Sequence, residues 1–217
     1  RIGILGATGA GKSALVNLVP RFYEATEGRI TIDGHDVRDI PQDQLREIVG
    51  IALQEAMLFQ GDVRFNLKFG AQEAEDKQMF EAAKAADAHG FVTGLPETWG
   101  APVARRGYNF SGGQRQRLSI ARTLTAAPKV LILDDSTSAL DVATESRVQA
   151  AIPELYEGIT TIYIAQRISA VIDLDRIVLM ESGEITAIGT HEELLESSPL
   201  YQEIYESQLG GVEEEKA

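Results

Sequence analysis

The segment Gly6–Ser13 holds the residues of this chain whose types and spacing best define a chemistry. Its sequence, Gly-Ala-Thr-Gly-Ala-Gly-Lys-Ser, matches the phosphate-loop pattern G-x-x-x-x-G-K-[ST]. Glycines let backbone N–H groups curl around phosphate oxygens, Lys12 adds a positive charge, and the Ser13 hydroxyl can coordinate Mg²⁺. A glycine turn with an accidental lysine is the alternative, and kinases, GTPases and ATPases all share such a loop. The residues expected to contact a nucleotide here are Gly6, Thr8, Gly9, Ala10, Gly11, Lys12, Ser13 and Ala14.

Two acidic residues follow the apolar run Val130–Leu133. Such a run is typical of a buried parallel strand, which would carry Asp134 and Asp135 at its carboxyl end. In phosphate-transferring proteins with this loop, a carboxylate so placed holds Mg²⁺, which makes Asp134 a candidate metal residue beside Ser13. An ordinary acidic strand end is the alternative.

Two further polar segments lie where they could face the same site. Gln54 follows a strand expected over Ile48–Leu53, although a plain polar strand end would look the same. The sequence Ser111-Gly112-Gly113-Gln114 directly precedes a stretch whose Gln, Arg and Leu residues favour helix. Taken alone, that segment would also fit a flexible polar loop.

Short apolar runs alternate with stretches of helical spacing, which implies an α/β protein with a mostly parallel sheet and helices on its faces. A loop is expected over Pro96–Gly107. Expected strands are Ile2–Leu5, Arg29–Gly34, Ile48–Leu53, Val130–Leu133, Thr160–Ala165, Arg176–Glu181 and Glu184–Ile188. Expected helices are Lys12–Phe22, Pro41–Glu47, Asp76–Ala88, Gly112–Leu124, Glu145–Leu155 and His191–Gln208.

The division of the chain follows from where the apolar strand runs stop. Residues 72–126 lack such runs, so we expect them to form a helical subdomain outside the sheet. Residues 1–71 and 127–209 then form the α/β core, with a small antiparallel part near residues 22–40. Residues 210–217 are expected to be an acidic tail.

Composition narrows the class of protein. The net charge of −13 at pH 7 argues against a nucleic-acid partner. No apolar run approaches the ~20 residues that a bilayer-spanning helix needs. The chain contains no cysteine, which fits a reducing compartment and excludes a disulfide scaffold. We therefore expect a soluble, acidic, cytoplasmic domain; because the chain opens inside an apparent buried strand, we also expect it to be an N-terminally truncated fragment.

Together these motifs resemble the nucleotide-binding domain of ATP-binding cassette (ABC) proteins, of the exporter type, over nearly the whole chain. The resemblance rests on the order of phosphate loop, Ser111–Gln114 (the signature segment) and acidic strand end. It implies a P-loop NTPase (RecA-like) core with a helical subdomain, ATP and Mg²⁺ as cofactors, and ATP hydrolysis coupled to transport. Supporting segments are Leu53–Phe59 around Gln54, Ser136–Asp141, and Gly189–Leu194.

The resemblance also implies partners. Two such domains would meet head to tail, so that the Ser111 hydroxyl and the Gly112 and Gly113 amides grip the γ-phosphate on the partner's phosphate loop. Gln54 would join the metal ligands, and Asp141 would lie at the dimer seam near the opposite site. A transmembrane domain would dock beside residues 55–59, which places this domain on the cytoplasmic face of a membrane.

Two departures from the family pattern bear on catalysis. Asp135 stands where the family usually has its general base, a glutamate; the shorter side chain withdraws the carboxylate by ~1 Å, a misplacement that can cost ~10²-fold in rate. Gln166 stands where the family usually has a histidine, and an amide can donate a hydrogen bond but cannot titrate. Together they resemble the degenerate-site subunit of a heterodimeric multidrug-type exporter, paired with a non-identical, catalytically competent domain.

The same motifs also fit other functions. Asp and Gln could still support a slow homodimeric ATPase, or the chain could be an ATP-gated clamp without turnover of its own. A non-transport ABC ATPase would predict coiled-coil inserts or tandem cassettes, and the sequence has neither. The aromatic residue that the family stacks on adenine lies well upstream of the phosphate loop, beyond the residues that precede Gly6 here.

Overall fold

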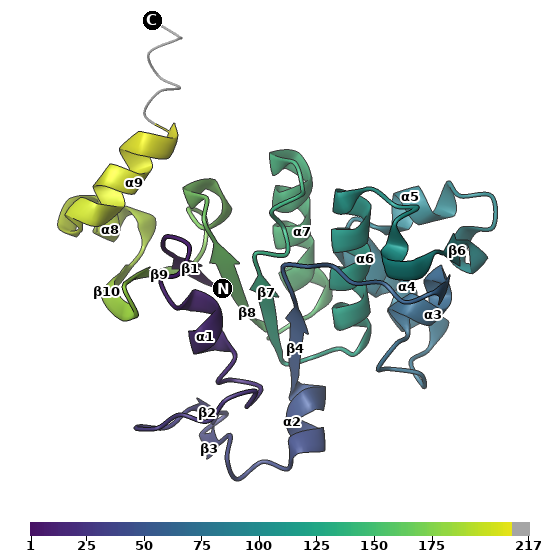
Figure 1. Ribbon diagram of the computed structural model, residues 1–217, viewed down its shortest axis with the longest axis horizontal. Helices are drawn as coiled ribbons and strands as arrows, with labels where there is room; N and C mark the ends of the chain where they lie inside the picture. The colour runs from purple at the N-terminus through teal and green to yellow at the C-terminus, as the bar shows by residue number, and fades with distance from the viewer. Residues whose placement is uncertain (210–217) are drawn as a thin grey trace, which may run out of the picture.

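A six-stranded sheet forms the centre of the computed structural model, which describes residues 1–209 (Figure 1). The strand order is β10-β9-β1-β8-β7-β4, and all neighbours are parallel except β9 and β10. The prediction of an α/β fold with a mostly parallel sheet is therefore confirmed. The strands are β1 (Ile2–Leu5), β4 (Val49–Ala52), β7 (Val130–Asp134), β8 (Thr160–Ala165), β9 (Arg176–Glu181) and β10 (Glu184–Gly189).

Both faces of the sheet are covered, which explains why the central strands read as continuous apolar runs. Successive side chains of β7 point to opposite faces: Leu131 and Leu133 join one hydrophobic cluster, while Ile132 joins the other. All five β7 residues are buried. The sheet is thus fixed from both sides, and the positions of its strand ends follow from this packing.

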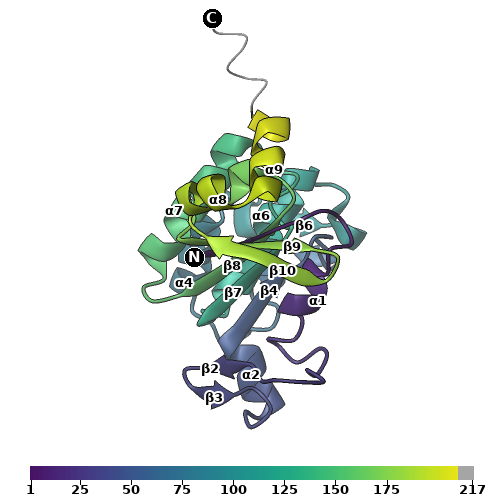
Figure 2. The ribbon, with the colours of Figure 1, turned by 90° about the vertical axis from the view of Figure 1, so that its left-hand side faces the viewer.

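The helices divide between the two faces (Figure 2). The smaller cluster contains residues of α1 (Lys12–Val16) and α2 (Gln42–Ile48), next to the hairpin of β2 (Thr31–Ile32) and β3 (His35–Asp36). The larger cluster contains residues of the helices on the other face. These are α7 (Val142–Leu155), α8 (His191–Ser197) and α9 (Pro199–Leu209).

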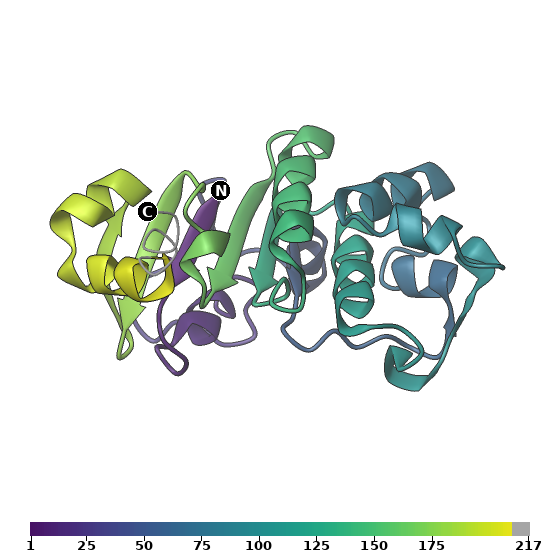
Figure 3. The same cartoon turned by 90° about the horizontal axis from the view of Figure 1, so that it is seen from above.

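A group of helices lies beside the sheet, beyond α7 (Figures 1 and 3). Buried alanines on α4 allow it to pack closely against α6, and α3 also contacts α6. Helix α3 contacts this group although it lies before residue 72. The boundary of the helical subdomain expected at residue 72 stays a prediction. The helices are α3 (Val63–Leu67), α4 (Asp76–Ala85), α5 (His89–Thr93) and α6 (Gly112–Thr125).

The segment expected to be a loop over Pro96–Gly107 contains regular structure. Strand β6 (Pro102–Val103) pairs antiparallel with β5 (Gly61–Asp62), between single 3₁₀ turns at Thr98–Gly100 and Arg105–Gly107. These elements are too short to leave a periodic pattern in the sequence.

Three expected helices are shorter than their patterns indicated, and the smallest difference is at α4, which ends at Ala85 rather than Ala88. Helix α1 ends at Val16 rather than continuing to Phe22, because Pro20 has no N–H to donate to the Val16 carbonyl. The Val19 N–H bonds that carbonyl instead, at 3.0 Å. The helix expected over His191–Gln208 divides at Ser198, which is held in an extended conformation before Pro199.

The strand expected over Arg29–Gly34 is reduced to β2 because the chain turns at Asp33 and Gly34. Both residues have positive φ, 50° and 82°, as the tight turn of a two-residue hairpin requires. The acidic tail expected over residues 210–217 lies outside the described residues. None of the helices within residues 1–209 is both long and apolar enough to cross a bilayer.

The buried position of β7 gives a testable stability prediction. Leu131→Ala should lower the free energy of unfolding by about 2–5 kcal/mol, because it opens a cavity in a packed core. Ile188→Ala, at a side chain that is mostly exposed, should change it by less than about 1 kcal/mol. Urea unfolding followed by circular dichroism measures both, and equal effects would contradict the assigned core.

Candidate active site

The phosphate loop connects β1 to α1, and its glycines are required for different reasons. Gly9 and Gly11 have φ of 85° and 93°, in the left-handed region that glycine adopts without strain. Gly6 instead packs tightly, since a Cβ there would lie 2.3 Å from the Met180 carbonyl oxygen of β9. Nothing lies within 4 Å of a Cβ built at Gly9, so the loop is open on that side.

Lys12 lies folded back inside the loop. Its Nζ donates hydrogen bonds to the carbonyl oxygens of Gly6 and Ala7, at 2.7 and 2.8 Å. Burial lowers the pKa of Lys12, and the nearby carboxylates of Asp135 and Asp134 act in the opposite direction. A phosphate group in the loop could replace the two carbonyl oxygens as acceptors and would keep the ammonium charged.

Ser13 and Asp134 meet at the carboxyl end of the sheet. The Ser13 hydroxyl donates to Asp134 Oδ1 at 2.9 Å, although 121 residues separate them in the sequence. A hydroxyl and a carboxylate are ligands that suit Mg²⁺, which keeps several waters and is usually shared with phosphate oxygens. Within residues 1–209 no cluster of three or more His, Cys, Asp or Glu side chains forms a complete metal site. The Ser13 hydroxyl and one carboxylate leave room for waters and phosphate oxygens, so these two residues fit a magnesium ion shared with a nucleotide.

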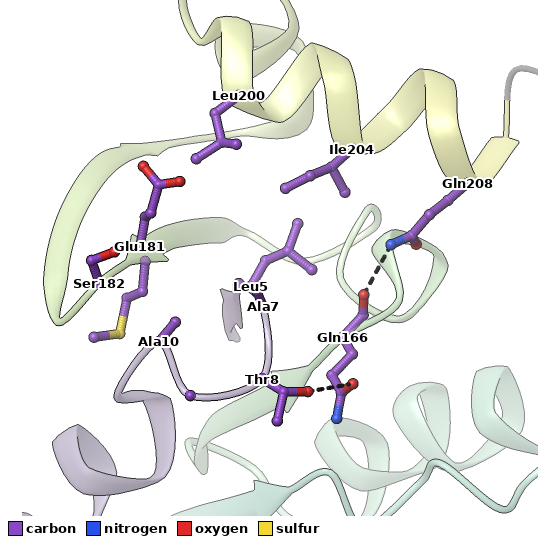
Figure 4. Close-up of a pocket in the computed structure, with 13 residues that line it drawn as sticks. Leu5, Ala7, Thr8, Ala10, Gln166, Glu181, Ser182, Leu200, Ile204 and Gln208 are labelled. Carbon is purple, nitrogen blue, oxygen red and sulfur yellow. Dashed lines mark hydrogen bonds between the residues drawn. The ribbon is translucent and has the colours of Figure 1, made fainter.

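Asp135 is the centre of a polar network. Its Oδ2 accepts hydrogen bonds from the amides of Gln54, at 2.9 Å, and Gln166, at 3.1 Å. The Gln166 Oε1 in turn accepts from the Thr8 hydroxyl at 3.3 Å (Figure 4). Partial burial raises the pKa of Asp135, the Gln166 hydrogen bond opposes this rise, and the like charge of Asp134 adds to it. Asp135 also has φ 48°, a left-handed conformation that Asp tolerates.

These side chains surround one cavity of about 280 Å³. It contains both acidic residues, Gln54 and Gln166, so most of the residues predicted for the nucleotide and metal do lie together. Gly6 and Ala10 line an adjoining cavity instead, beneath α9 (Figure 4). The residues lining the 280 Å³ cavity are Thr8, Gly9, Gly11, Lys12, Ser13, Ala14, Gln54, Asp134, Asp135, Ile164 and Gln166.

The signature segment lies elsewhere, at the start of α6. Ser111 Oγ accepts from the Gln114 N–H at 3.2 Å, and the Gln114 side chain accepts from the Ser111 N–H at 2.9 Å. This capping box fixes the helix start. None of Ser111–Gln114 lines the cavity around Lys12, so the chain does not bring its signature segment to its own phosphate loop.

Asp141, the last predicted site residue, caps α7. Its two carboxylate oxygens accept from the N–H and the hydroxyl of Thr144, at 2.9 and 2.8 Å. These hydrogen bonds lower the pKa of Asp141. Because its side chain is exposed and held in one orientation, it is available to a second molecule.

Sequence reasoning missed Gln116, which links the signature helix to the loop after β7. The buried Gln116 side chain donates to Ser138 Oγ at 3.3 Å and accepts from the Ala139 N–H at 2.8 Å. An added Cβ at Gly113 would lie 3.2 Å from the Ala139 carbonyl oxygen, so the approach is close. A glutamine inside a helix gives no sign in the sequence of which distant loop it contacts.

Sequence reasoning also missed the contacts that hold residues Gln166–Ile168, which we call the switch segment. Arg167 pairs with the buried carboxylate of Glu145 at 2.9 Å, and Thr137 donates to the same carboxylate. This network joins α7, the loop after β7 and the switch segment. Glu145 follows the helix cap Asp141 as an ordinary first-turn acid would, so its spacing did not distinguish it.

A phosphate loop at the end of a parallel sheet, with a Ser–Asp pair and a carboxylate beyond it, defines a P-loop nucleotide-binding protein. The chain belongs to the ABC transporter family, since the family model described as "ABC transporter" matches residues 1–138. It is an ATP-binding domain of that family, and such domains are ATPases. The fold expected from the resemblance is thereby confirmed.

Individual relatives agree with this assignment. The chain is 44% identical over 96% of its length to the ATP-dependent lipid A-core flippase of Syntrophus aciditrophicus, and covers 35% of that protein. It is 43% identical over 95% of its length to a putative multidrug export ATP-binding/permease protein of Staphylococcus aureus, covering 36%. A bacterial Atm1-family ABC exporter solved with ATP bound matches 96% of the chain at TM-score 0.91 and 38% identity. The chain thus spans about a third of the length of these relatives.

The pairing of Arg167 with Glu145 predicts an asymmetric cost of substitution. Arg167→Ala should lower the free energy of unfolding by about 1–3 kcal/mol, because it leaves a buried carboxylate without its cation. Arg176→Ala breaks an ion pair whose two side chains are both more than half exposed, and should cost less than about 1 kcal/mol. Chemical unfolding measures the two, and a larger effect at Arg176 would contradict the assigned network.

Proposed function

We propose that this chain is the ATP-binding motor domain of an ABC exporter, which binds Mg-ATP between two such domains arranged head to tail. The observation that carries the proposal is the separation of the signature segment from the chain's own nucleotide cavity. Ser111 is exposed and its hydroxyl, which accepts from Gln114, keeps its own hydrogen to donate. A second domain is therefore needed to bring a signature segment to each phosphate loop.

Within one cavity, the chemistry of the side chains and amides present suggests which residues would bind the phosphates and which would bind Mg²⁺. The loop amides and Lys12 would hold the β- and γ-phosphates, and Ser13 and Asp134 would hold Mg²⁺, with Gln54 completing the ligands. The magnesium ion, when bound, neutralises charge on the phosphates during transfer. The solved relative described as having ATP bound supports ATP as the nucleotide.

We further propose that the chain's own site hydrolyses ATP slowly. A general base must take a proton from water, and Asp135 is both shorter than glutamate and engaged by two amide donors. Gln166 can orient a γ-phosphate oxygen through its N–H but carries no charge to stabilise it. The partner would then be a non-identical domain with a competent site, which the intact signature segment of this chain would complete.

Two other functions fit the same geometry less fully. An ATP-gated clamp with no turnover would use the same cavity and the same dimer, and differs only in rate. A slow homodimeric ATPase needs Asp135 to act as base despite its short side chain. The alternative of a non-transport ABC ATPase is disfavoured, because the relatives described above are named as a flippase and an export protein.

The transmembrane partner would dock in a groove of about 440 Å³ between the sheet and the helical group. Leu53, Met57 and Phe69 line it with side chains that are all more than two-fifths exposed, an unusual concentration of apolar surface. Phe59 lies under the Arg122 guanidinium, 5.4 Å from ring centroid to Cζ. An amphipathic helix from a membrane domain fits such a groove, and would place the chain on the cytoplasmic face.

Nucleotide binding is tested at Lys12. Lys12→Ala should weaken Mg-ATP binding by about 10–150-fold, the range expected on losing a charge-assisted hydrogen bond. Lys129→Ala removes an exposed lysine outside the cavity and should leave the affinity unchanged. Isothermal titration calorimetry measures both. Equal affinities for Lys12→Ala and wild type would reject the proposed nucleotide site.

Slow turnover is tested by restoring the two usual residues. Wild type should hydrolyse Mg-ATP near background, and the Asp135→Glu/Gln166→His variant should gain a rate that rises steeply with protein concentration, because two domains form each site. Phosphate release measured across a wide range of protein concentration checks this. A wild-type rate already as high as that of the variant would favour the homodimeric ATPase.

A further inference from the structure

The last turn of α9 reaches the switch segment through one side chain. Gln208 Nε2 donates to the Gln166 carbonyl oxygen at 3.0 Å (Figure 4). Gln208 Oε1 accepts from the Ile168 N–H at 2.8 Å. The amide thus pairs with backbone groups on both sides of Arg167. We propose that Gln208 is a positioning residue for Gln166, so that α9 sets how the site contacts the γ-phosphate. This inference rests on the proposed contact between Gln166 and that phosphate.

The switch segment needs such support because the sheet does not extend to it. The pairing of β8 with β1 ends at Ala165 opposite Leu5, and its pairing with β7 ends at Ile164 opposite Asp134. Beyond these residues the backbone of Gln166 has left the ladders that fix β8. The two hydrogen bonds from Gln208 take over that constraint.

A second anchor holds the same segment from another helix, α7. The Arg167 side chain is tied to Glu145 of α7, while its neighbouring backbone groups are tied to α9. With the backbone of residues 166–168 fixed between two helices, the Gln166 side chain is directed toward Thr8 and Asp135. Loosening either anchor would let that amide shift, and the α9 anchor is the one that touches Gln166 directly.

Helix α9 is itself well anchored at its beginning. Tyr201 is fully buried and its hydroxyl lies 2.9 Å from His191 Nδ1, while Leu200 and Ile204 face the cavity beside the phosphate loop. Gln208 follows on the same helix face, since residues four apart lie one above another. That cavity, about 480 Å³, lies between α9 and the phosphate loop, so α9 reaches the site through the switch segment. There, Gln208 adds two directional hydrogen bonds to the apolar packing around Ile168.

Gln208 is exposed, which makes it a clean position to change. Gln208→Ala removes both hydrogen bonds. Gln208→Glu keeps an acceptor for the Ile168 N–H but places an oxygen against the Gln166 carbonyl, and so removes only the donor. Ser207→Ala, at the neighbouring exposed residue, is the matched control, because Ser207 makes no side-chain hydrogen bond among residues 1–209.

The experiment, on the 217-residue chain, measures separately the two Gln208 hydrogen bonds and their effect on nucleotide binding. Hydrogen exchange of the Ile168 amide, without nucleotide, should accelerate in Gln208→Ala and stay slow in Gln208→Glu and Ser207→Ala. Mg-ATP affinity should fall about fivefold in both Gln208 variants, because each would lose the proposed hydrogen bond from Gln166 to the γ-phosphate. Mg-ADP affinity should stay unchanged, since ADP has no γ-phosphate. The ATP-to-ADP ratio is the decisive readout, since general destabilisation would weaken both nucleotides alike.

Three results would overturn the inference. Unchanged exchange of the Ile168 amide in Gln208→Ala would show that Gln208 does not hold this amide in solution. Equal losses for ATP and ADP, or equal effects in Ser207→Ala, would assign Gln208 a merely structural role. A Gln166→Ala variant with a wild-type ratio of ATP to ADP affinity would instead reject the proposed γ-phosphate contact. That failure is distinguishable, because Ile168 exchange still tests the Gln208 hydrogen bond by itself.

Discussion

The register of the parallel strands is the constraint on which the rest of this structure depends. Leu5 of β1 lies opposite Ala165 of β8, and Ile164 lies opposite Asp134 of β7. Three strands therefore end level with one another, and the next residues of each are the phosphate loop, Gln166 and Asp135. Because both faces of the sheet are buried, a one-residue slip would turn every side chain of a strand to the other face. Packing thus fixes the geometry of the site.

That meeting point concentrates charge in an arrangement that suits a bound cation. Among residues 1–209, Lys12 is the one cationic residue that lines the cavity, against the two carboxylates of Asp134 and Asp135. Partial burial raises the pKa of Asp135, and the like charge of the neighbouring Asp134 acts in the same direction. A magnesium ion would reverse the local balance. The two amides on Asp135 both donate to its Oδ2, so in the proposed slow site that oxygen would have to release them before it could take a proton from water.

The sequence was informative where a site residue is defined by its neighbours along the chain. Gly9 and Gly11 adopt the left-handed backbone that their loop pattern implies, and Asp134 follows from the apolar strand before it. Gln208 could not be found this way, since its partners lie 40 and 42 residues earlier and a surface glutamine in a helix has no periodic signature. The length of α1 was predicted wrongly for a different reason, since the apolar spacing continues to Phe22 although Pro20 interrupts the helical hydrogen bonds.

Inside one chain, a short series of hydrogen bonds connects the signature segment to Asp135 of the phosphate site. Ser111 starts α6, and Gln116, little more than one turn later, bonds the loop at Ser138 and Ala139. The Ser138 N–H bonds the Asp135 carbonyl oxygen at 3.2 Å. In a head-to-tail pair, a shift of the signature segment on the partner's nucleotide would be transmitted along these contacts to the base position of this chain's own site. A slow site would then still respond to its neighbour, because the path runs through the Gln116 side chain and the backbone of residues 135–139, and not through the carboxylate of Asp135.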